Sequence, residues 1–245
     1  MALCEILEWD SAFFGRSIAR YRGAGCVDVR VLCAECAQRG IDCVYILVDS
    51  CDTRSVAALN RAGVLLTDVR LTFERRIAES ATPQRCGLPV RPATPSDLPT
   101  LKRLASVSHH LTRFYADPHF PAGQCDRLYE TWIERSCDGY ADDVLVAQNG
   151  GAPVGYVTCH HEPDGRGRIG LFAVDGSHQG RGVGGALLAA AAASFTAHGV
   201  STMTVATQLR NTRAVRLYER TGFAMRRADL WFHYWPASAR ETSRS

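Results

Sequence analysis

The pattern of apolar and polar residues in the first third of the chain predicts short strands alternating with helices. Residues 29–39 carry apolar positions at helical spacing and stop at Gly40. Asp52 or Thr53 can cap a second helix that runs to Arg61 and ends before Gly63. Apolar blocks typical of strands lie at residues 5–9, 17–22, 43–48 and 64–73. We therefore expect a small α/β domain over residues 1–77.

The rest of the chain predicts a second, larger α/β domain over residues 88–237. A polar, proline-containing stretch at 78–87 is expected to be a linker, and residues 238–245 are expected to be a flexible tail. Asn149-Gly150-Gly151 predicts the turn of a hairpin, and residues 115–121 predict an irregular loop. We expect strands at 88–91, 144–148, 154–159, 168–174, 201–207 and 230–235, and helices at 95–107, 125–135, 183–198 and 212–221.

Composition narrows the class of protein. Apolar residues make up 46% of the 245 residues and charged residues 22%, which is ordinary for a globular protein. The formal charge of +3 is too small to argue for a nucleic-acid partner, and no apolar run is long enough for a membrane span. The N-terminus lacks the pattern of a signal peptide, so the ten cysteines are expected to be reduced thiols in a cytoplasmic protein. Cys33 and Cys36 form a C-x-x-C without a matching second pair, so we expect no metal.

The segment from Val174 to Leu188 places a glycine-rich loop between an apolar strand and an alanine-rich helix. Glycines let a backbone turn tightly and approach a ligand. The N-terminus of a helix presents free N–H groups and the positive end of the helix dipole. This segment therefore predicts an anion site suited to a diphosphate.

Three cofactors compete for this loop. Gly180, Gly182 and Gly185 fit a dinucleotide motif, but no acidic residue ends the next strand near residue 207. A nucleotide-triphosphate loop would need Gly-Lys-Ser/Thr, which is absent. The remaining candidate is a CoA loop of the form Gln/Arg-x-x-Gly-x-Gly/Ala, which reads Gln179-Gly-Arg-Gly-Val-Gly184 here. An ordinary tight turn would need fewer glycines.

A second motif runs from Gln208 through Asn211 and Tyr218 to Phe223. Together with the glycine loop it resembles the GNAT superfamily of N-acetyltransferases over about residues 88–236. The resemblance implies an α/β GNAT fold, with a mixed, mostly antiparallel central sheet flanked by helices, and acetyl-CoA as cosubstrate. It also implies that the strand before the loop separates from its neighbour to admit the cofactor. The residues it implies for cofactor binding are Phe172, Ala173, Val174, Gln179, Gly180, Arg181, Gly182, Val183, Gly184, Gly185 and Asn211.

Further segments extend the resemblance to nearly the whole chain. These are Glu8-Trp-Asp-Ser-Ala-Phe-Phe-Gly15, Thr112-Arg-Phe-Tyr115, Tyr129-Glu-Thr-Trp-Ile133, Arg168-Ile-Gly-Leu171 and Val205-Ala-Thr-Gln208. They resemble GNAT enzymes that carry a smaller, partial GNAT-like domain before the catalytic one. Such enzymes acetylate the 4-amino group of dTDP-4-amino-4,6-dideoxygalactose, which implies a nucleotide-linked amino sugar as substrate. The exact sugar, the acyl chain length and the choice between monomer and homodimer stay open.

The reaction needs a bound thioester, a deprotonated amine and a proton for the departing thiolate. A tyrosine phenol has an ordinary pKa near ~10, so Tyr218 is protonated at neutral pH and suits the role of general acid. The alternative for Tyr218 is an ordinary core tyrosine. Asp68 is our hypothesis for the general base, with a solvated strand-edge aspartate as the alternative. Three histidines are rivals for the base: His109, His110 and His119.

Arg113 precedes the irregular aromatic loop and is a candidate to hold a sugar diphosphate through paired hydrogen bonds. Tyr115 is a candidate to stack on a base or sugar. Most arginines of the 210–220 segment are expected on a solvated helix face. Two other functions remain open: a GNAT enzyme acting on another small amine or a protein N-terminus, and a CoA-binding module without catalysis, which has no need for a proton donor at Tyr218.

Overall fold

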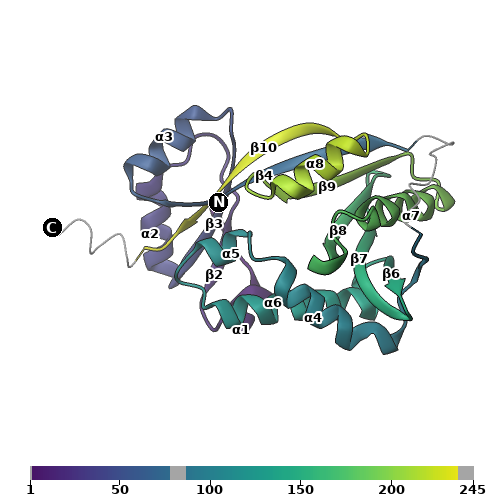
Figure 1. Ribbon diagram of the computed structural model, residues 1–245. Coiled ribbons are helices and arrows are strands. Elements are labelled where there is room, and N and C mark those ends of the chain that lie inside the picture. The colour runs from purple at the N-terminus through teal and green to yellow at the C-terminus, as the bar shows by residue number, and fades with distance from the viewer. Residues whose placement is uncertain (1, 78–86, 237–245) are drawn as a thin grey trace. The chain divides into compact units, whose positions relative to one another are not determined.

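The computed structural model describes residues 2–77 and 87–236 and shows a mixed α/β protein (Figure 1). The predicted linker, apart from Gly87, and the predicted tail lie outside the described residues. The strands are β1 (Cys4–Ile6), β2 (Ile18–Tyr21), β3 (Cys43–Asp49), β4 (Leu65–Arg76), β5 (Val90–Pro92), β6 (Asp143–Asn149), β7 (Ala152–His161), β8 (Gly167–Val174), β9 (Thr202–Gln208) and β10 (Ala224–Tyr234). The α-helices are α1 (Glu8–Phe14), α2 (Val29–Arg39), α3 (Thr53–Arg61), α4 (Leu98–Ser108), α5 (Arg113–Ala116), α6 (Ala122–Arg135), α7 (Val183–Ala197) and α8 (Thr212–Arg220). Short helical turns lie at Pro95–Asp97, Ser136–Tyr140 and Gly176–His178.

The described chain divides into two compact units. Unit 1 comprises residues 2–70, 112–120 and 227–236, and unit 2 comprises 71–111 and 121–226 except the undescribed 78–86. Because β4 and β10 cross these limits, each has residues in both units. The domain boundaries predicted at residues 77 and 88 stay a prediction, since the units join segments that are distant in sequence.

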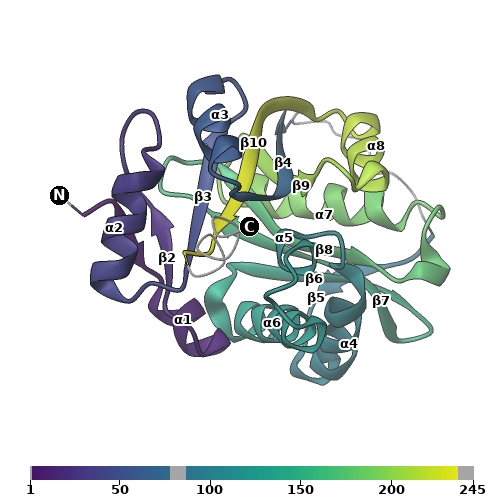
Figure 2. The same cartoon turned by 90° about the vertical axis from the view of Figure 1, so that its left-hand side faces the viewer.

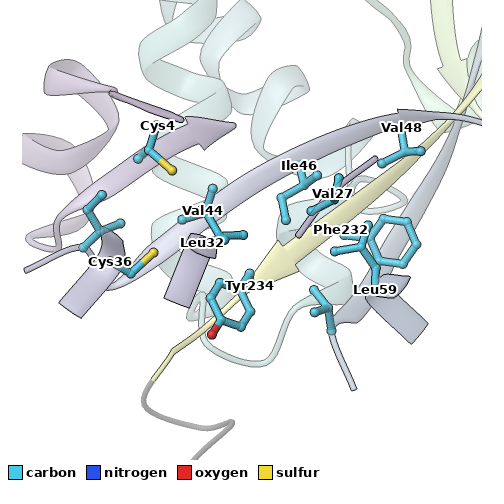
Figure 3. Packing of buried hydrophobic residues seen from close by; sticks show 13 residues of the cluster. Cys4, Val27, Leu32, Cys36, Val44, Ile46, Val48, Leu59, Phe232 and Tyr234 are labelled. Carbon is cyan, nitrogen blue, oxygen red and sulfur yellow. The ribbon is translucent and has the colours of Figure 1, made fainter. Parts of the chain in front are cut away.

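Unit 1 contains strands in the order β1-β2-β3-β10-β4. β2 and β3 run parallel and are connected through α2, whereas β1 pairs with β2 and β10 with β3 in antiparallel fashion. One face of these strands packs on α2 and α3 in the core of Figure 3. The buried residues of this core are Cys4, Ala19, Val27, Leu32, Cys36, Ile41, Val44, Ile46, Val48, Leu59, Val64, Phe232 and Tyr234.

Unit 2 contains strands in the order β4-β9-β8-β7-β6-β5. Strands β5 to β8 pair with one another in antiparallel fashion, whereas β8 and β9 run parallel and are connected by α7. Helices α4 and α6 lie side by side (Figure 2). α7 packs against β6, β7 and β8, where Gly155 and Gly167 bring the strands close to Leu187 and Phe195. The fold class predicted from the sequence, a mostly antiparallel mixed sheet flanked by helices, is confirmed.

Capping residues define the two helices of the front segment: Gly40 and Asp52 act as predicted, and Asp28 is a cap that was not predicted from the sequence. Asp28 caps α2 by accepting hydrogen bonds from the amides of Arg30 and Val31 at 2.9 and 3.3 Å. Asp52 caps α3 through the amide of Ser55 at 3.1 Å. Gly40, with φ 62°, ends α2 in the left-handed conformation that glycine adopts most easily.

Three segments differ from the sequence prediction. Residues 8–9, predicted as strand, begin α1, in which Trp9 and Phe13 stack one helical turn apart with ring centroids separated by 5.1 Å. Residues 113–116 form the single turn α5, where an irregular loop was predicted from residue 115. β10 begins at Ala224, six residues before the predicted strand. None of the described helices combines the length and apolar character needed to cross a lipid bilayer.

Candidate active site

β8 contains a bulge opposite Thr158 of β7. The pairing of the two strands shifts by one residue around Thr158, so Gly170 and Leu171 both face it. The Thr158 hydroxyl accepts a hydrogen bond of 2.8 Å from the amide of Leu171. A Cβ at Gly170 would lie 2.7 Å from Thr158 Oγ1 and 2.5 Å from His160 Nε2, so this approach of the strands requires glycine.

Beyond the bulge, β8 separates from β9. The two strands pair in parallel only at residues 167–169 with 203–205, and their ribbons diverge from there (Figure 1). In the described chain the rest of β8 therefore has β7 on one side and no paired strand on the other. This is the separation that the family resemblance implied for the strand before the glycine loop.

The exposed edge of β8 presents two backbone amides. Leu171 N points toward Thr158, and Asp175 N donates to Val154 O at 2.8 Å, so both point toward β7. Because successive residues of a strand alternate in direction, the amides of Phe172 and Val174 point the opposite way, toward the gap. Ala173, between them, is buried.

The glycine loop turns from β8 into α7 through two left-handed residues. Gly180 has φ 76° and Gly182 has φ 84°, values that L side chains rarely adopt. The first helical hydrogen bond of α7 runs from Ala186 N to Gly182 O at 3.1 Å, so the amides of the preceding turn are not used by the helix. A Cβ at Gly184 would lie 2.9 Å from Leu217 Cδ2 of α8. The loop thus has the shape of an anion cradle.

Side chains connect the loop to its neighbours. Gln179 Nε2 donates to Val174 O at 3.0 Å, and Arg213 of α8 donates to Gln179 Oε1. Val183 and Gly185 are buried at the start of α7, whereas Arg181 is exposed. Arg181 is therefore the residue of the predicted loop whose side chain is free to reach a ligand phosphate.

Asn211 and Tyr218 both belong to α8 or its cap. Asn211 Oδ1 accepts from Ala214 N at 3.2 Å and caps the helix, which leaves its Nδ2 group as a donor. Tyr218 is 3% exposed, and its ring lies 6.3 Å from that of Phe172 and 5.6 Å from that of Phe223. Burial raises the pKa of Tyr218 well above its ordinary value, so the phenol is protonated at neutral pH. The structure places this tyrosine beside Phe172 of β8, the strand that separates from β9.

The other predicted site residues lie in unit 1. Asp68 of β4 is 3% exposed, so the alternative of a solvated strand-edge aspartate is wrong. Arg113 and Tyr115 lie on α5, and both are half-buried. The residues predicted to bind the cofactor and Tyr218 thus lie in unit 2, and the residues predicted for the base and the sugar lie in unit 1.

A buried network in unit 1 holds Arg113. Asp117 accepts from His233 Nδ1 at 2.6 Å and from Trp235 Nε1 at 2.9 Å, and His233 Nε2 lies 2.9 Å from Arg113 Nη1. Burial lowers the pKa of His233 to about 4, so the ring is neutral and Nε2 accepts from the guanidinium. Burial alone would raise the pKa of Asp117, but hydrogen bonds from His233, His119 and Trp235 outweigh it and hold that pKa well below its usual range.

The three histidines considered as bases have other partners. His109 Nε2 lies 3.0 Å from the hydroxyl of Tyr156, and burial lowers the pKa of His109 to about 4. His110 Nε2 donates to Ser106 O at 2.9 Å, which is a C-terminal helix cap. His119 Nδ1 lies 2.8 Å from Asp117 Oδ1.

Sequence reasoning missed Thr158, Asp117 and His233. Thr158 acts through the register of two strands, and Asp117 meets His233 across 116 positions of the chain, so neither has a local signal. A surface hollow of about 600 Å³ in unit 1, lined by residues 26–30 and by Ala58, Arg61 and Ala62, contains none of the predicted site residues. Within the described ranges, no group of three or more His, Cys, Asp or Glu side chains is arranged to hold a metal ion.

Comparison with known proteins agrees with this geometry. A model of the acetyltransferase (GNAT) family matches residues 106–223. Over 234 residues the chain is 28% identical to a dTDP-fucosamine acetyltransferase of Escherichia coli O6:H1, covering 95% of this chain and 98% of that protein. Over 145 residues it is 30% identical to the spore coat polysaccharide biosynthesis protein SpsD of Bacillus subtilis. That match covers 59% of this chain and spans half the length of SpsD.

A solved structure shows the same fold. The crystal structure of a GCN5-related N-acetyltransferase from Sphaerobacter thermophilus superposes with a TM-score of 0.60 at 16% identity. The match covers 85% of this chain and 66% of that one. With the separated strand and the glycine loop, the matched residues 106–223 form an acetyltransferase domain of the GNAT family, a family that uses acetyl-CoA.

Proposed function

We propose that this protein transfers the acetyl group of acetyl-CoA to the amino group of a nucleotide-linked amino sugar, with dTDP-4-amino-4,6-dideoxygalactose as the first candidate. The observation that carries the acyl transfer is the open edge of β8, with Tyr218 beside Phe172. The choice of an amino sugar as acceptor is supported by the similarity to the dTDP-fucosamine acetyltransferase, because this similarity extends over nearly all of both chains.

The cofactor would lie along the open edge of β8. Acetyl-CoA supplies the thioester whose carbonyl carbon is attacked. The amides of Phe172 and Val174 would hold the pantetheine arm and the thioester oxygen, because they point into the gap beside β8. Amides of the turn from Gly180 to Gly185 would bind the CoA diphosphate, as the free N–H groups at a helix N-terminus bind anions. Nδ2 of Asn211 would donate to the CoA arm.

Tyr218 would act as the general acid. The uncharged amine attacks the thioester carbon, a C–N bond forms, and the C–S bond breaks. The departing thiolate takes the phenol proton of Tyr218, and the amine loses a proton to a base. Burial keeps the phenol protonated before the reaction, which this role needs.

The amine side of the site is assigned to residues of unit 1. We propose Asp68 as the base, acting directly or through one water, because it is a buried carboxyl on β4. Arg113 would hold the sugar diphosphate, since Asp117 and His233 fix one edge of its guanidinium and leave other N–H groups as donors. Tyr115 would stack on the base or the sugar.

A thiol-release assay against a panel of amines tests this proposal. The panel holds several dTDP-amino sugars, a free amino sugar, amino acids and a peptide with a free N-terminus. We expect turnover with a dTDP-4-amino sugar and far less with the same sugar lacking dTDP. Turnover only with a peptide or another small amine would replace the proposed substrate. Release of no thiol with any amine, while acetyl-CoA still binds, would indicate a CoA-binding module without catalysis.

A further inference from the structure

One face of the unit 1 sheet carries charged side chains that the proposed mechanism does not use. The strand register places Arg20, Tyr45 and His233 side by side on β2, β3 and β10. Their chain neighbours Ala19 and Val44 belong to the apolar core on the other face. Because side chains alternate along a strand, this row faces away from the core and toward α1 and α5.

Arg113 lies over this row. Its guanidinium carbon is 4.0 Å from the ring centroid of Tyr45 and 4.5 Å from that of Trp231. Its Nη1 is used by His233 at 2.9 Å, so the other guanidinium N–H groups remain as donors. Within the described ranges Arg113 forms no ion pair with a carboxylate. Arg70 of β4, by contrast, already forms an ion pair with Asp229, with Nη2 and Oδ2 3.0 Å apart.

Arg20 is a second cation on this face. In the part of the chain that the structure describes its side chain forms neither a hydrogen bond nor an ion pair, and its Nε atom is buried. Two carboxyl groups lie near the row: Asp117, which accepts from His233, and Asp10 of α1. Burial raises the pKa of Asp10, and the positive charges of Arg113 and Arg20 oppose that rise. Within the described residues neither carboxyl group forms an ion pair with Arg20 or Arg113, so both guanidinium groups keep N–H donors for a ligand.

The hydroxyl of Tyr45 is a further unused donor. Tyr45 is fully buried, and its oxygen forms no hydrogen bond of normal geometry with a described residue, although the Arg113 guanidinium covers its ring. Burial raises the pKa of this hydroxyl above its ordinary value, so it stays protonated. A buried polar group without a partner destabilises the folded state, and an acceptor that enters the row would remove this penalty.

We propose that Arg20, Arg113 and the Tyr45 hydroxyl form a site for the phosphate oxygens of a nucleoside diphosphate. All three supply donors and two supply positive charge, whereas a phosphate supplies only acceptors and negative charge. Guanidinium groups suit this ligand because they bind phosphate through paired hydrogen bonds. The inference rests on the proposed function, since it assigns the nucleotide part of the acceptor to unit 1, and it adds Arg20 and Tyr45 to the residues that choose the acceptor.

The test is a calorimetric titration of the full chain with dTDP and, separately, with inorganic pyrophosphate. Saturating CoA is present throughout, so that the glycine loop is already occupied. The test variant is Arg20→Gln. The matched control is Arg30→Gln, which removes the same charge from unit 1 at a side chain 96% exposed on α2. Arg113→Lys serves as a second test, because it keeps the charge and loses the paired hydrogen bonds.

We expect the wild-type protein to bind dTDP, and Arg20→Gln and Arg113→Lys each to weaken that binding about tenfold or more, as expected for the loss of a charged hydrogen bond. Arg30→Gln should bind as the wild type does. Equal dTDP and pyrophosphate affinities for Arg20→Gln and the wild type would overturn the proposal, even if dTDP-amino sugars are turned over. Tight, Arg20-dependent dTDP binding without turnover of any dTDP-amino sugar would instead uphold this site and refute the proposed function.

Discussion

At the scale of single residues, the role of Tyr218 can be separated from its packing. Replacing Tyr218 with Phe removes the proton donor and keeps a ring of the same shape beside Phe172. We expect kcat to fall by about 10²–10⁴-fold, the usual contribution of general acid catalysis, with little change in acetyl-CoA affinity. The control is Tyr140→Phe, at a tyrosine that is 64% exposed. Steady-state kinetics and a CoA titration measure both quantities, and a Tyr218→Phe enzyme as fast as the wild type would remove Tyr218 from the mechanism.

The sequence predicts some site residues and not others, for a physical reason. Asn211 and Tyr218 lie on one helix and its cap, so their spacing along the chain fixes their relation in space. Thr158 and His233 have no such relation to their partners, because the contacts depend on strand register and on which strands become neighbours. The residues predicted to bind the cofactor lie close together in the sequence and can be recognised as a motif. The residues around Arg113 come together only in the folded chain and cannot.

At the scale of elements, the glycine loop offers a comparison between two glycines. Gly182 has φ 84°, so alanine there is strained by about 1–2 kcal/mol and shifts the turn that leads into α7. Gly176 has an ordinary φ and open space around its Cβ position, so alanine there is the matched control. We expect Gly182→Ala to weaken acetyl-CoA binding severalfold and Gly176→Ala to leave it unchanged. Equal dissociation constants for the two variants would show that the left-handed turn is not needed for the cofactor.

The β8 bulge is a second element with a testable role. Thr158→Val keeps the shape of the side chain but leaves the amide of Leu171 without its acceptor, at a cost of about 1–3 kcal/mol. We expect a lower melting temperature and a lower rate of acetyl transfer, because the bulge precedes the amides of Phe172 and Val174. Thr158→Ser, which keeps the hydroxyl, should recover both. If valine and serine behave alike, the hydrogen bond does not hold the bulge in place.

Elements were predictable where a capping residue or a glycine marks their ends, as at α2 and α3. The strand predicted at residues 5–9 was wrong in its second half because a short apolar block fits a strand and a helix equally well. The bulge could not be predicted from the sequence, because β8 has an extra residue only relative to the strand with which it pairs, β7.

At the scale of the whole molecule, the class of fold follows from the sequence but the strand order does not. Each unit contains a parallel pair of strands joined by a helix, β2-α2-β3 in unit 1 and β8-α7-β9 in unit 2. In both, a second helix and a third strand follow along the chain. The strand beside β3 is nevertheless β10, and the strand beside β9 is β4. Alternating hydrophobicity identifies such strands but carries no information on which long-range neighbour each one selects.

Buried histidines predict how the stability of the whole molecule depends on pH. His160 is 7% exposed and His233 is fully buried, and burial lowers the pKa of each to about 4. In the unfolded chain their pKa is near ~6.5, so between these values the unfolded state binds protons that the folded state does not. The free energy of unfolding therefore falls as the pH falls from about 6.5 to about 4, by up to about 1.4 kcal/mol per pH unit for each histidine. Above about pH 6.5 neither histidine makes the free energy of unfolding depend on pH.

Thermal unfolding at about pH 7 and about pH 5 measures this effect. We expect a lower melting temperature at the lower pH, and a smaller difference for His160→Gln, which removes one of three histidines whose pKa burial lowers to about 4, the others being His109 and His233. His198→Gln, at an exposed histidine on the end of α7, is the control and should keep the wild-type difference. A His160→Gln protein with the full wild-type difference would show that His160 is charged in the folded state or unprotonated in both states. In either case the pKa of His160 beside Thr158 would not be lowered relative to the unfolded chain in this pH range.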